Sequence, residues 1–87
     1  GDYVTSAQIG RVLPGGPAER AGLQVGDTVL SIDGNPVREF QDIVANVSVG
    51  QGRVLQFRVQ RGTEVVELPV TPGTIEKVAG FVPTVSV

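Results

Sequence analysis

Positions that alternate between apolar and polar mark the strands of this chain. At residues 53–60, Leu55, Phe57 and Val59 share one face and polar side chains take most of the other, as in a strand with one buried face. A short turn, RGT, separates this segment from EVVELPV, which is its hairpin partner. Further strands are predicted at residues 7–13, at residues 28–32 and in the C-terminal tail.

Two of these strands carry more specific predictions. In the segment TVLSIDG, strict alternation places Val29 and Ser31 on one face and Leu30 and Ile32 on the other. Pro69 interrupts the second strand of the hairpin. Because proline donates no hydrogen bond to a neighbouring strand, this residue favours an edge position or a bulge.

One longer helix is predicted in the segment EFQDIVANV. Its apolar positions follow the i, i+3, i+4, i+7 spacing of a single helix face, and they are Phe40, Ile43, Val44 and Val47. Arg38 stands near its start, where Ser, Thr or Asp would cap better, so this boundary is poorly defined. Gly50 and Gly52 end the helix.

The glycine-rich stretch LPGGPAERAGLQVGD predicts a short helix between two strands. Pro17 suits the first helical turn and Gly22 suits a left-handed residue just beyond the last one. The stretch contains neither the spacing of a P-loop nor GxGxxG, so its role is to fold the chain rather than to hold a phosphate. Asp27 and Asp33 are each expected to bond backbone N–H groups within their own turn.

Composition limits the fold and the partners. With 87 residues and 40% hydrophobic residues, we expect one domain over residues 1–87, of the α+β class: a small curled antiparallel sheet, or partial barrel, of five to six strands with one short and one longer helix. The net charge of −2 and the scattered arginines argue against nucleic-acid binding. No apolar run is long enough to insert into a membrane. The start at Gly-Asp-Tyr suggests a piece of a longer protein.

Catalysis by this chain itself is not expected. It contains no histidine and no cysteine, which removes the usual general bases, thiolate nucleophiles and zinc ligands. The only lysine, Lys77, has no nucleophile motif around it. We therefore predict no catalytic residue, no metal site and no cofactor within these residues.

The segment PGGPAERAGLQVGDTVLSIDGNPV resembles the PDZ domains of bacteria. The resemblance is carried by a Pro-Gly turn, an Ala-Gly-Leu step, a Gly-Asp pair and a glycine turn after a strand, at Pro14, Gly15, Pro17, Ala18, Ala21, Gly22, Leu23, Gly26, Asp27, Ile32 and Gly34. It covers residues 7–70 well, and Gly16 replaces the commoner Ser or Asp. It implies a peptide-binding module that takes up an exposed peptide or protein C-terminus as an added strand.

The resemblance also implies where the peptide binds. The family's carboxylate-binding loop, which reads like Gly-Leu-Gly-Phe, is matched best at the end of the chain by Ala79, Gly80, Phe81 and Val82, which indicates a circularly permuted order. On the longer helix, the peptide-binding residues are Gln41, Ile43, Val44 and Val47. The alternative is that Phe81 only anchors the tail and that the apolar helix residues are core.

The tail GFVPTVSV is similar to the segment that follows PDZ domains in RseP-like site-2 zinc metalloproteases. That resemblance implies a regulatory domain on the periplasmic side of a bacterial inner-membrane protease that cleaves anti-sigma factors, with the zinc bound elsewhere in the parent protein. HtrA-type serine proteases and C-terminal processing peptidases are alternative hosts. A size-exclusion filter or scaffold without a peptide ligand is the alternative function.

Overall fold

The computed structural model describes residues 4–73 and 81–86, with side-chain positions for residues 7–73. The elements along the chain are β1 (Val4–Val12), α1 (Pro17–Ala21), β2 (Thr28–Ile32), β3 (Asn35–Pro36), α2 (Phe40–Val49), β4 (Leu55–Arg61), β5 (Glu64–Val70) and β6 (Phe81–Ser86). The strands pair antiparallel in the order β5-β4-β2-β1-β6, and β3 also pairs with β2. The sheet is open, with β5 and β6 at its edges, and the predicted α+β fold is confirmed.

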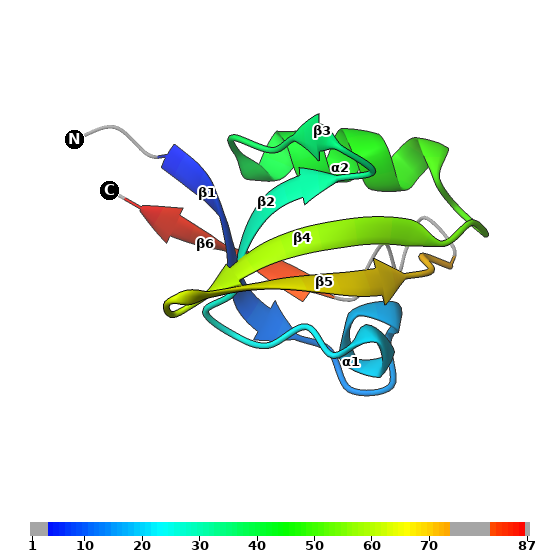
Figure 1. The fold of residues 1–87 in the computed structure, drawn as a ribbon, viewed down its shortest axis with the longest axis horizontal. Coiled ribbons are helices and arrows are strands. Elements are labelled where there is room, and N and C mark those ends of the chain that lie inside the picture. The colour runs from blue at the N-terminus through cyan, green and yellow to red at the C-terminus, as the bar shows by residue number, and fades with distance from the viewer. Residues whose placement is uncertain (1–3, 74–80, 87) are drawn as a thin grey trace.

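The core lies between α2 and the curled sheet. In Figure 1, α2 runs along the upper side of the molecule beside β2 and β3, while α1 lies below β5. Burial along β4 follows the predicted alternation, since Leu55, Phe57 and Val59 are buried and the residues between them are exposed. The buried apolar side chains are Ala7, Ile9, Ala18, Leu23, Val29, Ile32, Ile43, Val47, Leu55, Phe57, Val59 and Val70.

The predicted faces of β2 are wrong. The pairing of β2 with β4 shifts register between Val29 and Ser31, which is the signature of a bulge. The extra residue lets Val29 and Ile32 both enter the core, at 1% and 0% exposure, while Leu30 is left on the surface. Strict alternation would have buried only one of the two.

Local signals located the β4–β5 hairpin and the short helix correctly. The strands of the hairpin are joined at Gly62 and Thr63, and Pro69 lies in an edge strand, as predicted. Pro17 opens α1 and Gly22 closes it in the left-handed region at φ 94°. There the N–H of Leu23 returns to the carbonyl oxygen of Ala18 at 3.0 Å, which satisfies the end of the helix.

The start of α2 is better defined than its sequence suggested. Glu39, not Arg38, is the N-cap residue. The carboxylate of Asp42, in the first turn, accepts hydrogen bonds from the backbone N–H groups of Arg38 at 2.8 Å and of Glu39 at 3.1 Å. This side chain reaches back over the helix start, as the third residue of a capping box does.

Candidate peptide-binding site

The last strand, β6, offers an edge for strand addition. It pairs with β1 on one side, through Val12 and Phe81 and through Arg11 and Val82, and within the described residues it ends the sheet on the other. Its pairing with β1 shifts register twice, between Thr5 and Arg11. The backbone groups of an edge strand are the ones that a peptide can pair with.

The longer helix packs on the strands next to β6 rather than on β6 itself. It contacts β1 and β2, and β6 is the strand on the far side of β1. Among the helix residues assigned to peptide binding, Gln41 is exposed and Val44 is 39% exposed, so both are available to a ligand. Ile43 and Val47 lie in the core at 0% exposure, where a ligand reaches them only if neighbouring residues move.

The proposed carboxylate-binding loop is only partly described. Phe81 and Val82 open β6, so the predicted groove strand exists as a strand. Ala79 and Gly80 lie outside the described residues. No contact with a peptide tests this assignment, and it stays a prediction.

The glycine-rich stretch before α1 has its polar groups occupied within the chain. The N–H of Gly15 donates to the Glu19 carboxylate at 2.9 Å, and Arg20 Nη1 donates to the Gly15 carbonyl oxygen at 2.6 Å. An acidic side chain therefore stands where a phosphate would have to bind. This arrangement supports a folding role for the stretch.

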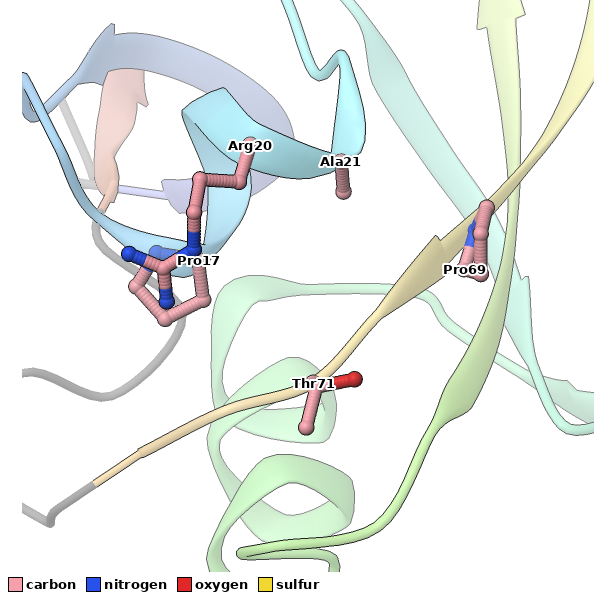
Figure 2. Close-up of a pocket in the computed structure, with 5 residues that line it drawn as sticks. All are labelled: Pro17, Arg20, Ala21, Pro69 and Thr71. Atoms are coloured by element: carbon pink, nitrogen blue, oxygen red, sulfur yellow. The ribbon is translucent and has the colours of Figure 1, made fainter.

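A shallow hollow lies between α1 and the end of β5 (Figure 2). Its lining residues are Pro17, Arg20, Ala21, Pro69 and Thr71. The guanidinium of Arg20 is directed toward the Pro17 side, consistent with its bond to Gly15. The hollow is small and open, and it presents no buried polar group to a ligand.

One polar contact near the site has no counterpart in the sequence-based predictions. On α2, Asn46 Oδ1 accepts a hydrogen bond from Nδ2 of Asn35 in β3 at 3.1 Å, and Asn46 Nδ2 donates to the Asp42 carbonyl oxygen at 2.8 Å. Asp42 and Asn46 are four residues apart, so they form a polar flank beside the apolar stripe. The four-residue spacing of Asp42 and Asn46 is visible in the sequence and could have predicted this polar flank. The sequence does not indicate that Asn35 is its partner.

Within residues 4–73 and 81–86, the structure places no three acidic, histidine or cysteine side chains together as a metal site would require. The described helices include none with the length and apolar character needed to cross a bilayer.

The chain is similar in sequence to segments of several proteases. It is 36% identical over 77 residues to metalloprotease MmpA of Caulobacter vibrioides, covering 88% of this chain and 19% of that protein. It is 40% identical over 65 residues to the probable protease eep of Enterococcus faecalis, covering 75% and 15%. Serine protease HTRA1 of Xenopus tropicalis is 39% identical over 75 residues, covering 86% and 16%. The chain thus spans less than a fifth of each of these proteins.

The fold has close counterparts among solved structures. The HtrA3 PDZ domain bound to a phage-derived ligand (FGRWV) superposes with a TM-score of 0.70 at 21% identity, covering 94% of this chain and 63% of that one. The PDZ domain of an SdrC-like protein of Listeria monocytogenes gives 0.71 at 19% identity, covering 88% and 81%. The family model described as PDZ domain matches residues 8–61. The chain belongs to the PDZ domain family.

Proposed function

We propose that this chain is a non-catalytic, regulatory PDZ domain that binds exposed apolar peptide C-termini by strand addition. The observation that carries the proposal is the edge position of β6. This strand pairs with β1, and α2 packs on β1. A peptide that pairs with β6 gains main-chain hydrogen bonds whatever its sequence. Selectivity then comes from the side chains beside it.

The side chains available on α2 favour an aliphatic ligand end. Val44 offers an apolar contact, and Gln41 lies one turn earlier on the exposed side of the helix. The chain has no histidine to accept a hydrogen bond from a Ser or Thr of the ligand. Peptides that end in Val, Leu or Ala are therefore expected to bind, and a Ser or Thr hydroxyl group in the peptide is not expected to add affinity.

We place the domain in a membrane-embedded site-2 zinc metalloprotease of a bacterium, on the periplasmic side. The identities to MmpA and eep support a protease host. The zinc would be bound elsewhere in the parent protein, because this chain lacks histidine and cysteine ligands. There the domain would regulate access of substrates such as anti-sigma factors. The match to HTRA1 supports an HtrA-type host as the second candidate.

A peptide titration followed by NMR tests the binding function. Peptides of about eight residues that end in Val, Leu or Ala should shift the backbone resonances of β6 and of Val44, with dissociation constants in the micromolar range. The same peptides with an amidated C-terminus should bind at least about tenfold more weakly, because the terminal charge is removed. Val44→Tyr should abolish binding by filling the space beside the helix.

Val49→Tyr is the matched control. Val49 is 77% exposed and lies on α2, but about 140° around the helix axis from Val44. This variant should bind the peptides as the wild type does. If no peptide shifts any resonance, the peptide-binding function is wrong. The size filter would then be supported by two results in the full protease. Deletion of the domain would loosen cleavage, and Val44→Tyr would leave cleavage unchanged.

A further inference from the structure

The β2–β3 hairpin is tied to one flank of α2 by side-chain hydrogen bonds. Asn35 follows the turn between β2 and β3, and its Nδ2 donates to Asn46 Oδ1 at 3.1 Å. Asn46 is held in turn by its Nδ2, which donates to the Asp42 carbonyl oxygen one helical turn earlier at 2.8 Å. The amide of Asn46 is thus fixed in orientation, with its oxygen directed at the hairpin.

The segment that joins the hairpin to the helix is fixed at a second point. The Asp42 carboxylate accepts from the backbone N–H groups of Arg38 and Glu39. Val37, between them and the hairpin, donates its N–H to the carbonyl oxygen of Leu30 at 2.9 Å. Asn46 is therefore bonded to β3 directly, while the connection between β3 and α2 is held to β2 through Val37 and to the helix through Asp42.

The opposite flank of the helix carries the side chains of the proposed peptide site. At 100° per residue, Val44 and Asn46 are about 160° apart around the helix axis. The buried residues Ile43 and Val47 lie between them on the core side. The helix therefore contacts the core through the side between its two flanks. If the Asn46 flank is released and the helix tilts about this contact, the Val44 flank is displaced as well.

We propose that Asn35 and Asn46 are positioning residues that set the placement of Val44 and Gln41 relative to the sheet, and thereby the affinity for peptide. The proposal rests on the proposed peptide-binding function. Neither asparagine touches the peptide in this scheme. Each acts through the orientation of α2.

Three variants test this positioning role: Asn35→Ala, Asn46→Ala and the double variant. Each single variant should raise the peptide dissociation constant by up to about fivefold, the factor that the whole free energy of one neutral hydrogen bond would give. The double variant should be no worse than Asn46→Ala, because Asn46→Ala already removes the bond between the two asparagines. In the free protein, both single variants should shift the amide resonances of Gln41 and Val44, across the helix from the substitution.

Gln60→Ala is the matched control for lost stability alone. It removes one side-chain hydrogen bond, from Gln60 Nε2 to the Gly62 carbonyl oxygen at 2.8 Å, in the other hairpin. It should leave both the peptide affinity and the Val44 resonance unchanged. Asn35 is exposed, so its variant is expected to fold even if Asn46→Ala does not.

The outcomes separate the two proposals. If the wild type binds peptide and Asn35→Ala binds it with the same affinity, the positioning role is wrong and the peptide function stands. If the wild type binds no peptide, the peptide function is wrong, and the free-protein resonances decide the coupling. Unchanged Gln41 and Val44 amides in Asn35→Ala would then refute the coupling across the helix as well.

Discussion

Arg61 and Asp27 form a two-point ion pair. Arg61 Nε donates to Asp27 Oδ1 at 2.9 Å, and Arg61 Nη2 donates to Asp27 Oδ2 at 2.8 Å. The Asp27 side chain is 1% exposed, and Oδ2 also accepts from the backbone N–H of Gln24 at 2.9 Å. Since Arg61 Nη2 also donates to the Gly22 carbonyl oxygen, the pair joins the end of β4 to the end of α1 and the start of β2.

Arg61→Met should lower the free energy of unfolding by about 3 kcal/mol, because it leaves a buried carboxylate without its cationic partner. Methionine keeps most of the apolar stem, so the loss reports on the ion pair. Urea denaturation measures it. Arg58→Met, on the same strand and exposed, should change stability by less than about 0.5 kcal/mol. Equal losses in the two variants would show that the pair contributes nothing specific.

Stability should fall in acid, partly through Asp27. Burial raises the pKa of Asp27, but the hydrogen bonds from Arg61 and Gln24 and the guanidinium charge outweigh burial and hold this pKa below its ordinary value. A carboxyl group whose pKa is lower in the folded state stabilises the fold above its unfolded pKa, about 4, and this contribution is lost as the pH falls through the folded pKa. Denaturation of the wild type from about pH 6 to pH 2 should show this loss.

Asp27→Asn is the variant that isolates this effect. It should be less stable than the wild type at pH 6, and the difference should shrink below about pH 4. Hydrogen bonds from two backbone N–H groups also lower the pKa of Asp42, so part of the acid sensitivity should persist. A constant difference between variant and wild type over the whole range would exclude Asp27 as a contributor.

The sequence predicted the elements whose signals are local. The alternation of Leu55, Phe57 and Val59 and the Pro17 and Gly22 signals of α1 are properties of a few neighbouring residues, and the structure confirms them. The faces of β2 were wrong because its bulge arises from pairing with β4, which lies far along the chain. The ion pair was missed for the same reason, since its two residues are 34 positions apart.

The candidate site was predictable to a similar extent. The helical repeat indicated which side of α2 is apolar, but it did not separate the buried Ile43 and Val47 from the exposed Val44. That separation depends on how the helix lies on β1 and β2. The bond between Asn35 and Asn46 depends on a hairpin that folds back onto the helix, and no pattern in the sequence announces it.

Asp33 stabilises the turn after β2 in a way that a substitution series can resolve. Its backbone lies in the left-handed region at φ 50°, and its Oδ1 accepts from the N–H of Gln56 at 2.8 Å, so it bonds across to β4 rather than within its own turn. Asp33→Asn keeps both features and should cost less than about 0.5 kcal/mol. Asp33→Gly keeps only the backbone freedom and should cost about 1 kcal/mol, while Asp33→Ala should cost about 2 kcal/mol. Equal losses for Gly and Ala would argue against backbone strain.

Gly50, after α2, is required because there is no room for a side chain, and not because of its backbone conformation. Its φ of −104° suits any residue, but a Cβ there would lie 2.6 Å from Leu55 Cδ2 and 2.8 Å from Leu55 Cδ1. Leu55 is 1% exposed and cannot turn away without repacking the core. Gly50→Ala should therefore lower the free energy of unfolding by about 1–3 kcal/mol, as measured by urea denaturation.

Gly73→Ala provides the comparison, because a Cβ at Gly73 meets no atom within 4 Å. It should be neutral or slightly stabilising, since alanine restricts the unfolded chain. The clash predicts coupling as well: in the background of Leu55→Val, which shortens the side chain, Gly50→Ala should cost less than it does in the wild type. If Gly50→Ala lowers the free energy of unfolding equally in both backgrounds, the Leu55 side chain is not what excludes a Cβ at position 50.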